Sequence, residues 1–411
     1  MNQASKTIEK FLRYVKVDTQ SSYDADTVPT TEKQKDLSRL LVRELKELGA
    51  SDVRTDEYGY VYASIPSNID KRVPAVAFIA HMDTSPAVSG ADVNPRIVHY
   101  EGGDIVLNEE NDIVLSPGEF PELANYAGHD LIVTDGTTLL GADDKAGVAE
   151  IMELAELLLN DPSIPHGDVK IAFTPDEEVG HGTDFFDVEG LGAEVAYTVD
   201  GGTIGEIGYE TFNAAALTLT IHGKSTHTGG AKGKMVNSLL LLMEFQNMLP
   251  VFDNPIYTEG REGFFHLDRA RGDVAETVAD YIIRDHDRTI FEERKERIRK
   301  IVAYLNERYG EGTFDAKIED TYYNMREVIE QHWDLIENAQ EAMRAIGVEP
   351  FSTEAARGGT DGSRLSFMGL PCPNLCTGGH NCHAIYEFAS IQEMEQCVQL
   401  LVNIAKLYAE K

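Results

Sequence analysis

Four apolar segments of this chain, each with the composition of a β-strand, run into side chains that commonly bind metal ions. In chain order, segment 76–80 leads to His81, segment 139–142 to Asp143, segment 169–173 to Glu177 and Glu178, and segment 195–199 to Asp200. In an open α/β sheet, the carboxyl ends of the strands meet at one crevice. The sequence therefore predicts an α/β fold with a mixed, mostly parallel sheet flanked by helices, and with these side chains gathered at one edge.

Composition narrows the classes of protein to consider. A chain of 411 residues exceeds what one core usually holds, so we expect two domains. Its net charge of −34 repels phosphate backbones, which disfavours nucleic acid as a partner. No apolar run approaches about 20 residues, and the N-terminal segment lacks the apolar block of a signal peptide. We therefore expect no membrane span and a cytoplasmic location, where the four cysteines remain reduced.

The pattern of elements changes between residues 211 and 323. The predicted elements are, in order, a strand at 214–222, a helix at 235–249, strands at 263–267 and 277–284, a helix at 289–309 and a strand at 314–318. The order β-α-β-β-α-β is that of the split ferredoxin-like unit. Since 211–323 contains none of the strand-end carboxylates, we interpret it as an inserted α+β domain. Residues 1–210 and 324–411 then form the metal-bearing domain, in which 100–130 is predicted to be a long irregular insertion.

The side chains at the strand ends match the ligands of a catalytic zinc site. Zinc accepts imidazole nitrogen and carboxylate oxygen, and two metal ions can share a bridging carboxylate. The candidate ligands are His81, Asp143, Glu178, Asp200 and His383. A single acid at a strand end is more often a helix cap or a turn residue. The coincidence of compatible side chains at four strand ends is what favours a metallohydrolase centre.

Two further acids beside these ligands have roles of their own in this hypothesis. Adjacent side chains at a strand end point in different directions, so Glu177 can stay free as a general base while Glu178 binds metal. Asp83, two residues after His81, is placed to accept a hydrogen bond from the second imidazole nitrogen, which fixes the tautomer.

Three residues outside these strand ends are candidates for contact with a substrate. His227 lies in a loop of small residues at 223–230. Arg284 and Arg357 could each bind a carboxylate in a bidentate manner. Taken singly, His227 is more often an ordinary loop residue, and each arginine is more often a surface salt-bridge partner.

Six motifs together resemble a known family. They are HMDT (81–84), GADDKAG (141–147), TPDEEVG (174–180), GKSTHTGG (223–230), RGGTDGS (357–363) and GGHNCH (378–383). In order and spacing they resemble the tripeptide aminopeptidase branch of the co-catalytic di-zinc peptidases, a family related to aminoacylase and carboxypeptidase G. The resemblance spans nearly the whole chain. It departs from the family pattern around His383, where Cys382 and Ala384 replace the expected Phe and Gly.

The resemblance implies a cofactor of two zinc ions per subunit, in a di-zinc exopeptidase catalytic domain with a ferredoxin-like lid domain. His81 and Asp200 would bind one ion, Glu178 and His383 the other, and Asp143 both. The peptide bond that follows Asp143 is expected to be cis.

The resemblance also implies roles for the remaining candidates. Glu177 would accept the proton of the attacking water, and Asp83 would orient the ligand histidine that precedes it. His227 would be a lid imidazole that binds the oxyanion, while Arg284 and Arg357 would contact the substrate carboxylate.

The function implied by this resemblance is a zinc-dependent aminopeptidase that removes the N-terminal residue from tripeptides. The alternatives on the same frame are a dipeptidase and a deacylase or desuccinylase that acts on N-acyl amino acids. A third alternative is a metal-binding scaffold without catalysis. Glu177 argues against the scaffold, because an acid beside the metals that is no ligand has no purely structural purpose. Short peptides are the expected partners, together with a second copy of the chain in a homodimer.

Overall fold

The computed structural model describes residues 5–25, 27–349 and 351–411, and the chain forms two compact units. Unit 1 comprises Met1–Tyr209, Glu327–Glu354 and Thr360–Lys411, and unit 2 comprises Glu210–Arg326 and Ala355–Gly359. Arg357 therefore packs in unit 2, rather than in the metal-bearing domain to which 324–411 is predicted to belong. Among the described residues, none of the helices combines the length and apolar character needed to cross a membrane.

Unit 1 is built on a seven-stranded mixed sheet in the order β1-β2-β8-β3-β9-β15-β10. The strands are β1 (Ser51–Thr55), β2 (Val61–Ile65), β3 (Val76–His81), β8 (Val169–Thr174), β9 (Val195–Gly201), β10 (Ile207–Gly208) and β15 (Asn374–Cys376). The adjacent strands β8, β3, β9 and β15 run parallel. All six residues of β3 are buried, as is typical of a parallel strand covered on both faces. The predicted mixed sheet is confirmed, and its parallel strands end at a common edge.

Helices cover both faces of this sheet. The helices of unit 1 are α1 (Lys6–Tyr14), α2 (Gln34–Leu48), α3 (Ala142–Asn160), α4 (Val188–Leu191), α8 (Asp334–Ala345), α9 (Asp361–Phe367), α10 (Ile391–Glu410) and α7 (Arg326–Ile329), whose first residue is assigned to unit 2. One face packs on α3, which in turn contacts α1, α2 and α10, and α4 and α9 pack on the other face. A Cβ at Gly147 would lie 1.9 Å from the carbonyl oxygen of Val199 in β9. Glycine thus lets the first turns of α3 approach the strand ends.

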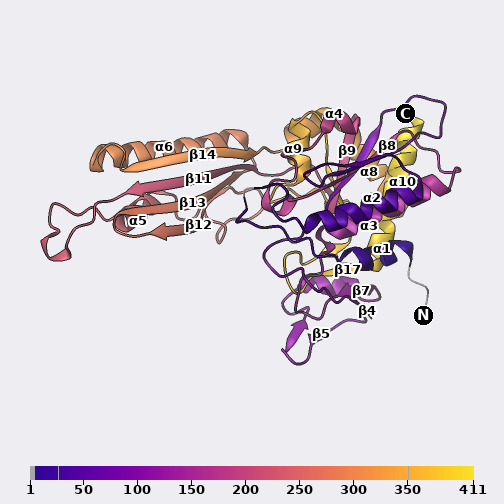
Figure 1. The fold of residues 1–411 in the computed structure, drawn as a ribbon, viewed down its shortest axis with the longest axis horizontal. Coiled ribbons are helices and arrows are strands. Elements are labelled where there is room, and N and C mark those ends of the chain that lie inside the picture. The colour runs from indigo at the N-terminus through magenta and orange to yellow at the C-terminus, as the bar shows by residue number, and fades with distance from the viewer. Residues whose placement is uncertain (1–4, 26, 350) are drawn as a thin grey trace. The chain divides into compact units, whose positions relative to one another are not determined.

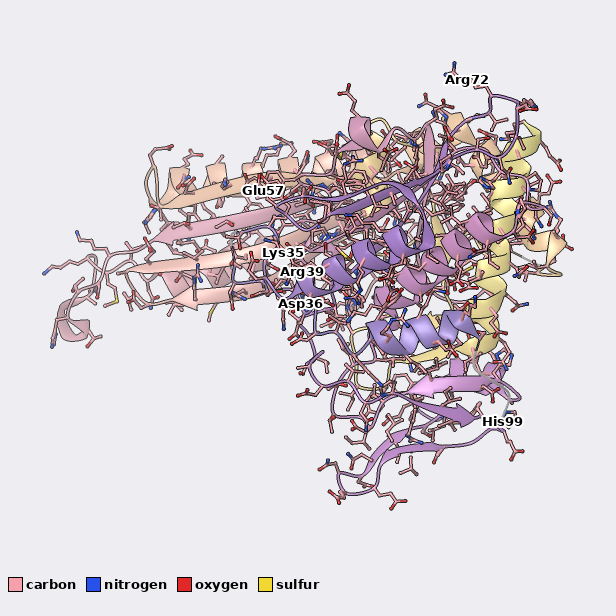
Figure 2. All side chains as sticks on the ribbon, turned by 45° about the vertical axis from the view of Figure 1, so that its right-hand side comes forward. Lys35, Asp36, Arg39, Glu57, Arg72 and His99 are labelled. Carbon is pink, nitrogen blue, oxygen red and sulfur yellow. The ribbon has the colours of Figure 1, made fainter. Side chains whose placement is uncertain are left out.

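The burial of α2 follows directly from its sequence pattern. Leu37, Leu41 and Leu45 recur at helical spacing and are buried. Asp36 and Arg39 lie on the opposite, exposed side of the helix (Figure 2). This distribution is that of an amphipathic helix with one face on the core.

The segment predicted as an irregular insertion instead forms strands, so that prediction was wrong. It contains β5 (Ile105–Asn108), β6 (Ile113–Leu115) and the 3-10 helix η1 (Pro121–Tyr126), and it lies between β4 (Arg96–His99) and β7 (Asp130–Val133). β4 and β7 form a second sheet with β16 (Gly379–His380) and β17 (Phe388–Ser390), in the order β16-β17-β7-β4. The partners of β7 on one side thus lie near the C-terminus, where a local pattern could not reveal them. β16 and β17 flank the loop that carries His383.

Unit 2 contains the predicted order of elements, which is confirmed. The elements are β11 (Asn213–His222), α5 (Ser238–Met248), β12 (Phe264–Gly272), β13 (Glu276–Asp285), α6 (Arg288–Tyr309) and β14 (Phe314–Tyr322). The strands form an antiparallel sheet in the order β12-β13-β11-β14, and they run side by side in Figure 1. Alternate residues of β11, such as Leu217 and Leu219, are buried against a core that includes Phe245 of α5 and Phe291 of α6.

Candidate active site

The carboxylate of Asp143 lies between two histidine side chains. Its Oδ1 is 2.9 Å from Nε2 of His81, and its Oδ2 is 3.0 Å from Nε2 of His383. His81 is the last residue of β3 and is 2% exposed, whereas His383 lies in a loop with a φ of 63°. Each oxygen of one carboxylate therefore faces a different imidazole, although the two histidines are far apart in the sequence.

Two more acids complete this group. Nε2 of His383 lies 2.8 Å from Oε2 of Glu178, and Nε2 of His81 lies 3.5 Å from Oδ1 of Asp200. The second oxygen of Glu178, Oε1, is buried without a hydrogen-bond partner among the described residues. Buried carboxylates that crowd around two imidazole nitrogens repel one another unless a cation lies among them. The donor set thus fits divalent metal ions, and the structure brings all five predicted ligands together.

The pKa values reflect this crowding. Burial raises the pKa of Glu178 to about 7 and that of Asp200 to about 6, although their histidine partners oppose the change. Burial would also raise the pKa of Asp143, but His383 and His81 hold it below its usual range. Hydrogen bonds with Asp143 and Glu178 raise the pKa of His383 to about 11. Burial alone would lower the pKa of His81, yet Asp200 and its other carboxylate neighbours raise it well above its usual value. Metal ions compete with these imidazole protons for the same nitrogen atoms.

Asp83 connects His81 to the turn that follows β8. Its Oδ1 is 3.3 Å from Nδ1 of His81, and its own backbone oxygen is slightly closer to that nitrogen, at 3.1 Å. Its carboxylate also accepts hydrogen bonds from the backbone N–H groups of Glu177 (3.0 Å) and Glu178 (3.3 Å). The buried Asp83 therefore fixes both a candidate ligand and the pair of glutamates.

Glu177 lies in the 3-10 helix η2 (Glu177–Val179), where it is half-buried. Burial raises its pKa well above the usual range, Asp200 adds to this effect and His81 opposes it. The same turn carries Glu178, whose side chain faces His383. The two adjacent acids thus differ in environment, as expected if Glu178 binds metal and Glu177 acts as the general base.

The Asp143-Asp144 peptide bond is cis, which confirms that prediction. The side chain of Asp144 accepts hydrogen bonds from the backbone N–H groups of His81 (3.1 Å) and Gly147 (3.2 Å). Asp144 therefore caps the start of α3 and ties it to the end of β3.

The candidate substrate residues His227 and Arg284 belong to unit 2. His227 is exposed, and its Nδ1 accepts a hydrogen bond from the backbone N–H of Gly229 at 3.1 Å. The guanidinium of Arg284 donates to the backbone oxygen of Ile283 at 3.0 Å and lies 5.4 Å from the ring centroid of Tyr322.

Arg357 is more fully engaged with protein atoms than the sequence led us to expect. Its Nη1 donates to the backbone oxygens of Gly260 (2.8 Å) and Glu262 (3.0 Å), and its Nη2 donates to Oγ1 of Thr258 (2.9 Å). The guanidinium also lies 5.2 Å from the ring centroid of Phe212. These contacts fasten the segment Ala355–Gly359 within unit 2, so the geometry favours a structural role for this arginine.

Three buried acids around the site had no predicted role. Asp176 accepts hydrogen bonds from the backbone N–H of Thr30 (2.6 Å) and from Nε2 of Gln34 (2.6 Å). Asp361 accepts one from Oγ1 of Thr174 at 2.6 Å, and burial raises its pKa to about 7. The third acid is Glu387. An acid within an apolar stretch, as in the sequence Tyr-Glu-Phe-Ala at 386–389, is the signal that could have identified it.

Comparison with known proteins places this site in a family. Residues 130–407 match the model of peptidase family M20/M25/M40. Peptidase T of Caldanaerobacter subterraneus is 56% identical over 408 residues, which cover 99% of this chain and 100% of the relative. Peptidase T of Alkaliphilus oremlandii is 53% identical over 406 residues, which cover 98% and 99%.

Solved structures have the same fold. The aminopeptidase PepT from Bacillus cereus superimposes with a TM-score of 0.77 at 23% identity, and a tripeptidase from Staphylococcus aureus with 0.78 at 22%. Each comparison covers 99% of this chain and 98% of the other. With the family match and the two relatives of more than half identical sequence, the chain belongs to peptidase family M20/M25/M40 and is similar over its whole length to Peptidase T.

Proposed function

We propose that this peptidase is a zinc-dependent aminopeptidase that removes the N-terminal residue from tripeptides. The observation that carries the proposal is the placement of Asp143, whose two carboxylate oxygens face His81 and His383 at 2.9 and 3.0 Å. A bridging ligand of a two-metal site needs this arrangement. The substrate class follows from the similarity to proteins named Peptidase T and to a tripeptidase of the same fold.

The residues present would hold two zinc ions per subunit. His81 and Asp200 would bind one, Glu178 and His383 the other, and Asp143 both. Oε1 of Glu178 is buried and has no hydrogen-bond partner among the described residues, which supports this assignment, because such an oxygen is costly unless a ligand occupies the site. When bound, such a metal pair lowers the pKa of water and polarises the scissile carbonyl.

Glu177 is the residue of this chain that moves the proton. Its backbone is held by Asp83 at 3.0 Å, and its carboxylate has an elevated pKa because it is buried beside other acids. A raised pKa brings the carboxylate closer to the working pH, where general-base catalysis is most efficient. Glu177 would take a proton from the attacking water and return it to the leaving amine.

Unit 2 would act as a lid that supplies His227 to the substrate. Because Nδ1 of His227 accepts from Gly229, the proton of the neutral imidazole resides on Nε2. Nε2–H is then free to donate to the oxyanion, as stabilisation of the transition state requires. Closure of unit 2 over the metals would also exclude water.

Arg284 is the better candidate for binding the C-terminal carboxylate of a tripeptide. Among the described residues, its guanidinium donates through Nη1 to the backbone oxygens of Ile283 at 3.0 Å and Ala215 at 3.5 Å, whereas Arg357 makes three hydrogen bonds through both Nη1 and Nη2. A guanidinium has five N–H donors, so Arg284 retains donors for a substrate carboxylate.

A substrate panel tests this function. The purified protein would be assayed with added zinc on di-, tri- and tetrapeptides that carry free or acetylated N-termini. The proposal expects hydrolysis of free tripeptides at the first peptide bond and little turnover of acetylated ones. Release of the acyl group from acetylated substrates would instead establish the deacylase alternative, and a preference for two residues would establish the dipeptidase.

Location and assembly are further parts of the proposal. We propose a cytoplasmic enzyme, because the cysteines are free thiols, as is usual in a reducing compartment. Cell fractionation tests this. We also propose a homodimer, which sedimentation velocity tests at concentrations around those of the activity assay.

A further inference from the structure

The carboxylate of Glu387 accepts hydrogen bonds from the backbone N–H groups of the turn that leads to Asp143. Its Oε2 accepts hydrogen bonds from the N–H groups of Leu140 and Gly141, both at 2.7 Å, and its Oε1 accepts one from the N–H of Asp143 at 3.0 Å. Glu387 is 1% exposed. Three converging N–H groups form an anion-binding concavity, and a side chain of the protein occupies it.

The shape of this turn depends on Gly141. Its φ of 81° lies in the left-handed region that favours glycine. This backbone turn directs the N–H groups toward Glu387 while it delivers the Asp143 side chain to the two histidines. Without an acceptor, the buried N–H groups would be left unpaired, at considerable cost.

Glu387 is also tied to the loop that carries His383. Its backbone N–H donates to the oxygen of Ala384 at 3.2 Å, and Nδ2 of Asn381 donates to the oxygen of Tyr386 at 3.2 Å. His383 therefore lies inside a compact turn whose last residue is Glu387. One side chain thus connects the backbone of Asp143 to the loop of His383, and these two residues face each other at 3.0 Å.

We propose that Glu387 is a positioning residue that holds Asp143 and His383 in register for metal binding, although it touches neither imidazole nor substrate. This inference rests on the proposed two-zinc site. Glu387 acts by fixing the backbone that aims the bridging carboxylate and by holding the histidine loop against it. Its loss should therefore weaken zinc binding more than it weakens the fold. Partners of this kind typically change metal affinity about 10- to 100-fold when they are removed.

The substitution Glu387→Gln is the sharpest test, because it keeps size and shape. A carboxylate accepts hydrogen bonds at both oxygens, whereas an amide accepts at one and donates at the other. The amide nitrogen would therefore meet at least one backbone N–H donor. The matched control is Glu153→Gln in α3, where a buried glutamate pairs with Lys10 at 2.6 Å, away from the metal-type residues.

Zinc affinity would be measured on the full-length protein by competition with a chromophoric chelator, and thermal unfolding would be followed on the same metal-free samples. We expect about 10- to 100-fold weaker zinc binding for Glu387→Gln and unchanged zinc affinity for Glu153→Gln, even where the control lowers the unfolding temperature. If Glu387→Gln does not fold, Glu387→Asp, which keeps the charge but retracts it, takes its place with the same expectation.

Two results would overturn this inference in distinguishable ways. A parent protein that binds two zinc ions, with a Glu387 variant that binds them equally well, removes the role of Glu387 and leaves the proposed function intact. A parent protein that binds no zinc removes the proposed function, and with it the inference.

Discussion

The carboxylate of Asp83 accepts a hydrogen bond from the backbone N–H of Glu177 at 3.0 Å, so the end of β3 holds the end of β8 in place. The same carboxylate faces the Nδ1 atom of His81 at 3.3 Å. A candidate metal ligand and the candidate base are thereby positioned by one buried side chain. Its removal should affect metal binding and proton transfer together.

Asp83→Asn should weaken zinc binding by about 10- to 100-fold and lower kcat as well. The amide has one accepting oxygen, so it cannot serve the N–H groups of both Glu177 and Glu178. Metal titration and steady-state kinetics on one preparation measure both effects. Asp56→Asn is the control, since Oδ1 of Asp56 accepts from two backbone N–H groups, those of Tyr58 and Tyr60, in a turn that carries none of the candidate ligands. Equal zinc affinity in both variants would contradict the prediction.

Glu177→Ala and Glu178→Ala should fail in different ways. Glu177→Ala removes the base and no ligand, so we expect both metals to be retained while kcat falls by about 10² to 10⁴. Glu178→Ala removes a candidate ligand that lies beside His383, and we expect loss of metal. Plasma emission spectroscopy gives the metal content of each variant. Stoichiometric metal loss in Glu177→Ala would exclude its assignment as the base.

His227→Ala should lower kcat for tripeptides by a factor of about 10² to 10³, the usual cost of one lost oxyanion donor. It should leave the zinc affinity unchanged. His222→Ala is the control, because His222 is also exposed in unit 2 and pairs only weakly with Glu276 at 3.2 Å. Tripeptide kinetics and zinc titration on both variants test this prediction. Unchanged kcat in His227→Ala would show that His227 does not bind the oxyanion.

Substitutions of Arg284 and Arg357 should have different effects, the first on the preference for substrate length and the second on the stability of the fold. Arg284→Ala should reduce the preference for tripeptides over tetrapeptides, because it removes the proposed contact to the substrate carboxylate. Arg357→Ala should mainly lower the unfolding temperature, because its three hydrogen bonds fasten Ala355–Gly359 within unit 2. Ratios of kcat/KM for three- and four-residue substrates, together with thermal melts, test both. The assignment is reversed if Arg357→Ala alone changes the length preference.

Glu150 should destabilise the fold increasingly as the pH rises. It is fully buried in α3, neither carboxylate oxygen has a hydrogen-bond partner among the described residues, and burial raises its pKa well above the usual value. The folded state then keeps the proton where the unfolded state has lost it, so stability falls once the pH exceeds the unfolded pKa of roughly 4.3.

Glu150→Met should therefore raise the free energy of unfolding by about 1 to 3 kcal/mol at pH 8 and by less at pH 5. Glu153→Met in the same helix should be destabilising at both, since it leaves Lys10 without one of its partners. Denaturant unfolding at the two pH values measures the difference. An equal gain at both values would mean that ionisation of Glu150 plays no part.

Three of the candidate metal ligands, His81, Glu178 and Asp200, could be placed at one edge of the sheet from local patterns, because each ends or follows an apolar strand, whereas the segment before Asp143 forms no strand and Asp143 lies at the start of α3. His81 and Asp200 stand at the ends of apolar strands, and parallel strands bring such ends together whatever the remainder of the chain does. The elements of unit 2 were predictable for the same reason, because alternation along β11 and helical spacing along α6 are local properties.

The features that escaped prediction depend on partners distant in the sequence. β7 pairs with β17, and Arg357 binds the backbone of Gly260 and Glu262. Glu387 serves a turn that includes Leu140, more than half the chain away. No periodicity within a segment encodes such pairings, so only the fold reveals them.

The position of β15 has a consequence for synthesis of the enzyme on the ribosome. β15 lies between β9 and β10 in the sheet, although it comes almost last in the chain. Until Asn374–Cys376 has emerged, a nascent chain has an open sheet edge at β9, and until His383 has emerged it lacks one of the candidate metal ligands. Unit 2, by contrast, finds nearly all of its contacts within Glu210–Arg326 and can fold earlier. On the proposed assignment of His383 as a metal ligand, the peptidase therefore gains activity only after this C-terminal segment has been synthesised.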